Sequence, residues 1–182
     1  MGLMVEPLVE CVDAVRAADP RDAHLVFLTP QGRTYHQTTA EEFSNKERLI
    51  LVCGRYEGFD QRAIDLLQPD EVSLGDFVLN GGETAAMVVI DSVCRLLPGV
   101  LGDESSSRRD SFSSDDRLLE YPQYTRPPVY RGLAVPEILL SGNHQAIEAW
   151  RRQKSLEVTR AKRPDLLGGA SKEALSRRPS DQ

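Results

Sequence analysis

The sequence has no long run of hydrophobic residues. None of its apolar stretches approaches the roughly 20 residues that a membrane-spanning helix needs. The N-terminal segment, MGLMVEPLVECVDAV, carries acidic residues where a secretory signal needs a basic start followed by an apolar core. We therefore expect a cytoplasmic protein with no membrane partner.

Cysteine is also scarce. Cys11, Cys53 and Cys94 are an odd, widely spaced set in apolar surroundings, so we expect three buried thiols rather than disulfides or metal ligands. The three histidines show no metal-ligand spacing either. The sequence thus predicts no metal site.

Basic residues are in the minority, with 22 Lys and Arg against 28 Asp and Glu and a net charge of −6. The deficit is uneven along the chain. Residues 1–117 carry a net charge of −10, whereas residues 118–182 carry +4. Such asymmetry can mark an end that binds a polyanion, although a solvated basic helix face gives the same pattern.

The length of 182 residues suits one good core and a small second unit. Apolar periodicity and turn signals predict alternating helices and strands in the first half. The helices are expected at 7–18, 38–46, 59–67 and 83–97, and the strands at 24–28, 49–53 and 72–79. This alternation predicts an α/β domain over residues 1–102 with a parallel sheet.

The composition changes after residue 102. Residues 103–117 are rich in Ser, Asp and Arg, which predicts a flexible linker. Residues 118–182 then form the second domain, with a long helix at 144–162 that Asn143 can cap. Basic residues interrupt the apolar residues of that helix.

Three turns are expected near the ends of the predicted strands: LTPQG at 28–32, CGRYEG at 53–58 and LGDFVLNGG at 74–82. The carboxyl ends of parallel strands meet at one sheet edge, where ligands of α/β proteins bind. The glycines would let backbone approach a ligand closely, although each one alone is explained by its turn. None of these turns matches a Walker loop or a GxGxxG pattern, so ordinary nucleotide-phosphate or dinucleotide binding is not supported.

Two charged residues could carry chemistry. Asp110 lies in the Ser-rich segment, where it is either a solvated acid or a general base brought in when the segment orders. Arg95 lies near the end of an apolar helix. It could cap the last carbonyls, pair with an acid, or stabilise a developing negative charge. Composition does not choose among these roles.

Six motifs, with their spacing, resemble those of one family: GRYEGFDQR, SLGDFVLNGGE, LPGVLG, DSF, YPQYTRP and LLSGNH. The chain resembles the bacterial TrmD-type tRNA (guanine-N1)-methyltransferases of the SPOUT class from about residue 4 to 167. The resemblance implies an α/β domain with a deep trefoil knot, a flexible linker and a small α-helical C-terminal domain. It also implies a homodimer that holds S-adenosyl-L-methionine in the knot.

The resemblance assigns cofactor binding to the three glycine-containing turns. The residues implied are Leu28, Thr29, Pro30, Gly54, Tyr56, Glu57, Ser73, Leu74, Gly75, Phe77, Leu79, Gly81 and Gly82. A buried adenosine read largely by backbone groups fits an apolar pocket with few polar side chains.

The implied reaction is methyl transfer to N1 of the guanine just 3′ of the anticodon in tRNA. Asp110 would remove the N1 proton as general base, and Arg95 would stabilise charge that develops at O6. Subunits of the family share each active site, so Asp110 would serve the cofactor of the partner chain. The basic C-terminal domain would grip tRNA phosphates through Arg151, Arg152, Lys154 and Arg163.

The sequence departs from the family pattern in two ways. Relatives begin with a strand, a helix and a Gly-rich loop, roughly fifty residues, before the segment that starts here near Met4. Phe77 also stands where relatives often have Tyr, which removes a hydroxyl and keeps the ring. The first departure suggests the alternative, a catalytically weak or inactive N-terminally truncated paralogue that acts as an RNA-binding or dimerisation module. Methylation of another RNA by the same fold is a third hypothesis.

Overall fold

The computed structural model describes residues 2–55, 57–100, 110–113 and 115–168. The chain divides into two compact units, residues 1–102 and 103–182. The first contains α1 (Val5–Ala17), β1 (His24–Thr34), α2 (Gln37–Ser44), β2 (Leu49–Cys53), α3 (Gln61–Leu67), β3 (Asp70–Ser73) and α4 (Glu83–Cys94). The second contains β4 (Val129–Tyr130), β5 (Leu133–Ala134), η1 (Glu137–Leu140), α6 (His144–Lys162) and η2 (Pro164–Leu166). Within the described ranges, no helix is long and apolar enough to cross a bilayer.

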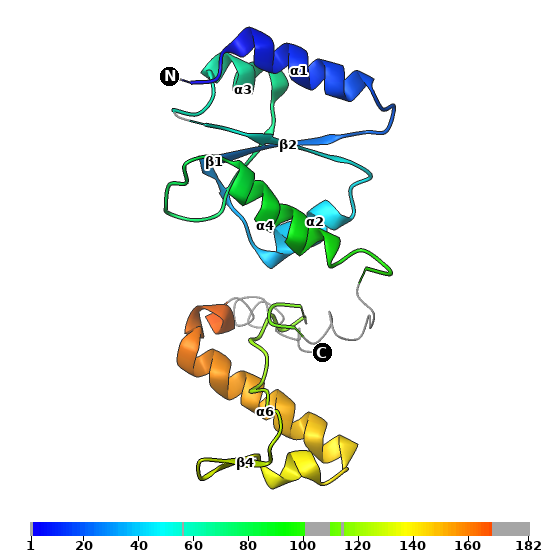
Figure 1. Cartoon of the computed structure of the whole chain (residues 1–182), viewed down its shortest axis with the longest axis vertical. Helices are drawn as coiled ribbons and strands as arrows, with labels where there is room; N and C mark the ends of the chain where they lie inside the picture. The colour runs from blue at the N-terminus through cyan, green and yellow to red at the C-terminus, as the bar shows by residue number, and fades with distance from the viewer. Residues whose placement is uncertain (1, 56, 101–109, 114, 169–182) are drawn as a thin grey trace, which may run out of the picture. The chain divides into compact units, whose positions relative to one another are not determined.

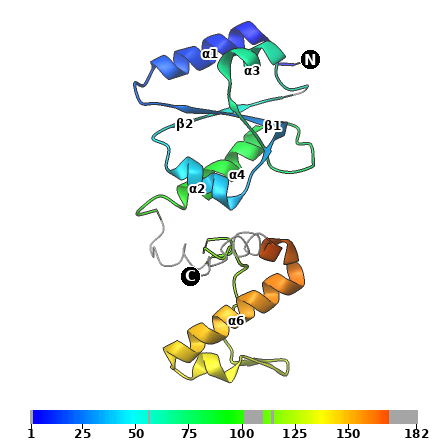
Figure 2. The ribbon, with the colours of Figure 1, turned by 180° about the vertical axis from the view of Figure 1, so that it is seen from behind.

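The first unit is built on a parallel sheet of three strands in the order β2-β1-β3. Helices α1 and α3 cover one face, and α2 and α4 cover the other (Figure 1, and from behind in Figure 2). After β1 the chain forms β2 on one side of it, and it then crosses over β1 to form β3 on the other side. Right-handed crossovers in opposite directions place their helices on opposite faces, which explains the positions of α2 and α3. The predicted α/β fold with a parallel sheet is confirmed.

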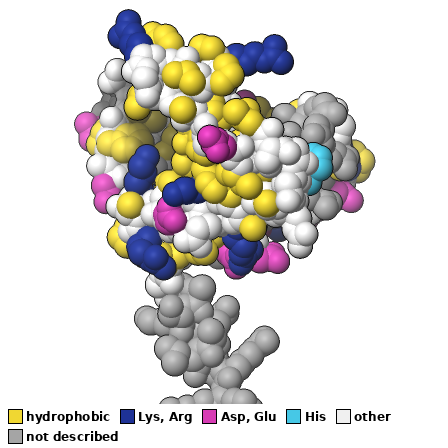
Figure 3. Space-filling view, turned by 90° about the horizontal axis from the view of Figure 1, so that it is seen from below, with side chains coloured by type: hydrophobic (Ala, Val, Ile, Leu, Met, Phe, Trp, Pro, Cys, Tyr) yellow, Lys and Arg dark blue, Asp and Glu magenta, His cyan; other side chains and the backbone are white. Residues whose placement is uncertain are grey.

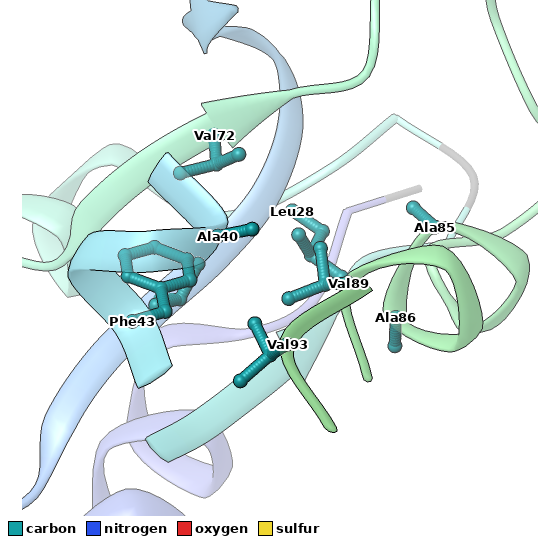
Figure 4. Packing of buried hydrophobic residues seen from close by; sticks show 9 residues of the cluster. Leu28, Ala40, Phe43, Val72, Ala85, Ala86, Val89 and Val93 are labelled. Atoms are coloured by element: carbon teal, nitrogen blue, oxygen red, sulfur yellow. The ribbon is translucent and has the colours of Figure 1, made fainter. Parts of the chain in front are cut away.

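Strand β1 supplies both halves of the core. Successive side chains of a strand point to opposite faces, so Leu25 and Phe27 pack with α1 and α3, whereas Val26 and Leu28 pack with α2 and α4. Figure 4 shows Leu28 in the second cluster together with Phe43 of α2 and Val89 and Val93 of α4. Because both faces are covered, β1 is apolar without interruption from 25 to 28.

Strand β1 pairs with β3 twice. Leu28 and Arg33 both align with Val72, so the pairing shifts register across the intervening residues. The predicted turn at 28–32 is therefore an irregularity inside one long strand. A Cβ at Gly32 would lie 2.3 Å from the backbone carbon of Glu71, so the close approach of the two chains requires glycine there.

Two of the predicted element boundaries are wrong. The strand expected at 72–79 is β3, Asp70–Ser73, because the chain turns away after Ser73 instead of continuing in the sheet. The helix expected at 38–46 is α2, Gln37–Ser44, and the residue before it, His36, makes no side-chain capping bond. Thr39 is buried inside the helix.

Three predictions of burial are also wrong. Cys11 and Cys94 are exposed, and Cys53 is half-buried. Leu66 is an apolar residue of the helix predicted at 59–67, where apolar periodicity implies burial, but it is 68% exposed because Ala63 and Leu67 occupy the inward face of the short helix α3.

The apolar side chains of α4 lie on two faces. One face is buried, with Val89 and Val93 fully or almost fully covered. The other face is exposed at Met87, Val88 and Ile90. The apolar surface of this helix is thus larger than its own unit can cover.

The second unit depends on α6, which begins after Asn143 as predicted. The Asn143 side chain accepts a hydrogen bond from the backbone N–H of Ala146 at 3.1 Å. Thr159 of α6 is fully buried, accepts from the N–H of Leu119 at 2.9 Å and donates to the carbonyl of Ser155 at 2.7 Å. This hydroxyl therefore joins the preceding segment to the helix.

Candidate functional site

The first unit has a pocket of about 370 Å³ beside the carboxyl ends of its strands. Ligands of open α/β sheets bind at the switch point, where the connections leave toward opposite sides of the sheet. Here that point is β1, because β2 lies on one side of it and β3 on the other. The wall comprises Leu28, Thr29, Pro30, Gln31, Gly54, Arg55, Glu57, Gly58, Phe59, Gln61, Ile64, Val72, Ser73, Leu74, Phe77, Val78, Leu79, Asn80, Gly81, Gly82 and Ala85. Its volume lies within the usual range for a small-molecule site.

All three predicted turns meet at this pocket. Every residue assigned to the cofactor lines it, except that Gly75 is not part of the wall and Tyr56 lies outside the described residues. The sequence did not single out Phe59, Gln61 and Ile64, which come from the segment leading into α3 and from α3 itself. Their signal was proximity in sequence to the second turn, since a helix that follows a strand begins at the same sheet edge.

The turns at 53–58 and 74–82 are joined by a hydrogen bond just before α4 begins. The backbone N–H of Gly82 donates to the carbonyl of Gly54 at 2.8 Å. A Cβ at Gly82 would lie 2.8 Å from the Cα of Cys53, closer than real Cβ atoms come to backbone. Beside this contact, Nε of Arg55 donates to Oε1 of Glu83 at 2.7 Å. The glycine thus permits the close approach, and an ion pair spans the same junction.

The third turn is held by its own polar groups. The Ser73 hydroxyl lies 3.1 Å from the carbonyl and 3.2 Å from the N–H of Gly75, and the N–H of Phe77 donates to the same carbonyl at 2.9 Å. The turn leaves apolar side chains outside: Phe77 is 55% and Val78 is 84% exposed. This wall therefore presents rings and aliphatic groups to a ligand or to another surface.

The charged groups at the pocket perturb one another. The pKa of Glu83 is held below its usual value, first by its own backbone N–H at the start of α4 and then by Arg55. Burial raises the pKa of the half-buried Cys53 thiol, and the negative charge of Glu83 raises it further. At neutral pH the junction therefore carries an ionised carboxylate next to a neutral thiol.

The two residues predicted to carry chemistry lie in different units. Arg95 is the residue at which α4 ends, half-buried, and its N–H donates to the carbonyl of Asp91 at 3.2 Å. Asp110 begins the described part of the second unit, where its carbonyl accepts from the N–H of Ser113 at 3.2 Å. The next residues fold back, since Ser111 accepts from the N–H of Glu120 at 2.9 Å.

Each of the four cations predicted to grip tRNA already has a carboxylate partner. The pairs are Arg151 with Glu148, Arg152 with Asp116, Lys154 with Glu157, and Arg163 with Asp165, at 2.6–2.7 Å. The Arg151 guanidinium also lies 4.8 Å from the centre of the Tyr121 ring, and its Nε is buried without a partner. These cations must exchange or share a carboxylate before they can hold a phosphate.

A second group of ionisable side chains lies where β1 and β3 begin. Potential ligand atoms of His24, Glu42 and Asp70 lie within 4.8 Å of one another, a proximity that sequence spacing did not predict. Arg33 already donates to both carboxylates, at 3.1 Å to Glu42 and 2.7 Å to Asp70. Arg33, and then His24, hold the pKa of Asp70 below its usual value. The arrangement is that of a salt-bridge network closed by an arginine.

Comparison with known proteins shows which family the chain belongs to. A family model described as tRNA (Guanine-1)-methyltransferase TrmD matches residues 1–169. Proteins named tRNA (guanine-N(1)-)-methyltransferase are 58% identical over 167 residues in Dehalococcoides mccartyi, 58% over 172 in Rhodopirellula baltica and 53% over 177 in Geotalea uraniireducens.

These matches cover 92%, 94% and 97% of this chain and 66%, 71% and 70% of the respective relatives. The chain therefore spans about two thirds of the length of the curated relatives it matches. The resemblance found in its motifs is confirmed, and the chain belongs to the tRNA (guanine-1)-methyltransferase TrmD family.

Proposed function

We propose that this chain transfers a methyl group from S-adenosyl-L-methionine to N1 of the guanine immediately 3′ of the anticodon in tRNA. The observation that carries the proposal is the convergence of three glycine-containing turns on one pocket of about 370 Å³. Relatives that are 53–58% identical carry the name of this activity.

The pocket suits an adenosine-containing ligand. Leu28, Gly54 and Gly82 lie in its wall, and the two glycines have no side chain to keep a ligand away from the backbone. Phe59 and Ile64 add apolar surface. S-adenosyl-L-methionine bound there would supply an electrophilic methyl group. The deep trefoil knot of the family, made by the same turns, is part of the proposal.

The chain's own residues would handle the proton. N1 of neutral guanine carries a hydrogen and is a poor nucleophile, so a base must accept that proton as the N–C bond forms. We assign this role to Asp110 and assign to Arg95 the stabilisation of negative charge at O6. Arg95 and Asp110 belong to different units, and in the proposed dimer Asp110 would serve the cofactor of the partner chain.

A homodimer with shared sites follows from the same proposal. Met87 and Ile90 of α4 are 69% and 51% exposed, and Val78 at the pocket wall is 84% exposed. Exposed apolar side chains in this number are typical of a surface that another chain covers. We propose that a second copy buries this face of α4.

The experiment has two parts. Isothermal calorimetry with S-adenosyl-L-methionine should show binding, and an unmodified tRNA transcript with a guanine 3′ of the anticodon should gain one methyl group at N1, detected by mass spectrometry. The control transcript carries adenine at that position and should remain unmethylated. Absence of binding heat and of thermal stabilisation by the cofactor would remove the enzyme function, because a ligand that binds the folded state must stabilise it. Binding without transfer would instead favour the non-catalytic RNA-binding module.

A further inference from the structure

The β4–β5 hairpin of the second unit has no core of its own. Val129 pairs with Ala134 and Tyr130 pairs with Leu133, and all four residues are exposed. Figure 1 shows the hairpin extending away from α6. A hairpin of two strands is marginally stable in water without a packed face. Its exposed side chains therefore need a different explanation from packing within the unit.

The tip of the hairpin is formed by Arg131 and Gly132, both with positive φ, as in the tight turns that match strand twist. The guanidinium of Arg131 lies 5.3 Å from the centre of the Tyr130 ring. Tyr130 is 59% exposed and the opposite Leu133 is 78% exposed. The hairpin thus presents an aromatic ring, a planar cation and an aliphatic side chain together.

The charges around the hairpin differ from those on α6. Residues 121–136 contain Arg126 and Arg131 and no acidic residue. Across the part of the chain that the structure describes, neither arginine has a carboxylate partner. The four cations near or on α6 described above are all paired, so a polyanion meets less competition at the hairpin.

We propose that this hairpin is an RNA-contact site, with Tyr130 stacking on an unpaired base and Arg131 holding an adjacent phosphate. Single-stranded RNA is recognised by stacking on aromatic and Arg planes, and cations supply the contacts to the backbone. The segment from Arg126 to Gly132 has no charge that would repel a phosphate. The proposal rests on the proposed function, because tRNA is the RNA that supplies the unpaired base.

The anchoring of the hairpin supports this role. The N–H of Val135 donates to the carbonyl of Pro128 at 2.8 Å, which extends the ladder beyond the two paired rows. Upstream, the ring of Tyr124 lies 6.4 Å from that of Trp150 on α6. The base of the hairpin is thus attached to the helix while its tip remains accessible.

The test compares tRNA binding by the full chain and its variants, measured by fluorescence anisotropy at several salt concentrations. Tyr130→Ala should weaken binding about tenfold with little change in salt dependence, since stacking is lost and charge is kept. Tyr130→Phe should bind like the unchanged chain. Arg131→Gln should reduce the slope of log affinity against log salt by about 1. The matched control is Arg16→Gln on α1 of the first unit, which removes the same charge and should leave tRNA affinity unchanged.

Three outcomes would overturn the inference. If Tyr130→Ala binds tRNA within twofold of an unchanged chain that itself binds and methylates, the hairpin role is wrong and the proposed function stands. If the unchanged chain binds cofactor but no tRNA, both fail. If Tyr130→Ala instead changes the molecular mass measured by sedimentation, a second copy and not RNA covers the hairpin. A photoreactive amino acid placed at position 130 should crosslink to the tRNA.

Discussion

The two units of this chain are stabilised in different ways. Of the hydrophobic side chains that are buried in the described ranges, all lie in the first unit except Leu118 and Ile147. The first unit has two apolar clusters, one on each face of the sheet. The second has a long helix whose most buried residue, Thr159, is polar.

The comparison separates two tasks. A rigid, doubly covered sheet can hold three turns in fixed positions around a small ligand. A unit with little buried apolar surface keeps its aromatic and charged side chains at the surface, where a large polar partner can reach them. Figure 3 shows, from below, a face on which hydrophobic side chains gather with both basic and acidic side chains among them. Each prediction below should therefore affect one task and spare the other.

The largest effect is expected for Asp110→Asn. Loss of the general base should lower the rate of methyl transfer by about 10²–10⁴-fold, because the amide cannot accept the N1 proton. The affinity for S-adenosyl-L-methionine should stay nearly unchanged, since the described pocket is built from residues of the first unit. Single-turnover kinetics with radiolabelled cofactor and calorimetry measure the two quantities.

Asp116→Asn is the matched control for the same chemical change in the same unit, at an acid paired with Arg152. It should retain transfer. A cofactor affinity that falls as steeply as the rate in Asp110→Asn would contradict the assignment of the base.

A smaller effect, confined to the first unit, is expected for Gly82→Ala. The new methyl group would meet the Cα of Cys53 at 2.8 Å and the backbone N of Gly54 at 3.0 Å, and neither can move without shifting a strand end. Overpacking of this kind costs about 1–3 kcal/mol. We expect about tenfold weaker cofactor binding by calorimetry, while tRNA affinity changes little.

Gly168→Ala provides the comparison, because nothing lies within 4 Å of a Cβ built at that position. It should bind cofactor normally. Cofactor affinity preserved in Gly82→Ala would show that the contact between the second and third turns does not shape the pocket.

The smallest effect is expected for Thr159→Val, which keeps the shape and removes the hydroxyl. The N–H of Leu119 would lose its acceptor, which costs about 1–3 kcal/mol of unfolding free energy when the group stays buried. Denaturant unfolding followed by Trp150 fluorescence reports on this unit, because Trp150 is the only tryptophan of the chain. Cofactor binding should be unaffected.

Thr159→Ser retains the hydroxyl and should keep most of the stability. Equal denaturation midpoints for Thr159→Val and the unchanged chain would argue against a structural role for the hydrogen bond between Leu119 and Thr159.

Elements with a clear apolar period could be predicted from the sequence. Strand β2 has the expected bounds, Leu49–Cys53, and α6 begins at His144 after its cap. The apolar run from 72 to 79 predicted too long a strand. Phe77, Val78 and Leu79 are residue types typical of strands, but here they line the pocket and are exposed. Apolar side chains used for binding cannot be told from core side chains by pattern alone.

The pocket was predictable because its residues lie in turns that must meet at one sheet edge. The partners of charged residues were not. Asp116 pairs with Arg152 from 36 positions away, and Asp70 pairs with Arg33 from 37 positions away. Such pairs form only when the chain has folded. The sequence therefore indicated Arg152 as a cation for tRNA but did not indicate that Asp116 would be its partner.

The central position of β1 has a consequence for how the chain acquires its structure during synthesis. Of the three strands in this sheet β1 is made first, and both of its neighbours come later, at Leu49–Cys53 and Asp70–Ser73. All its pairings are parallel and distant in sequence, which is typical of slow folding. The apolar residues 25–28 must therefore wait for Ser73 to leave the ribosome, and an early arrest of translation would release a chain with that strand uncovered.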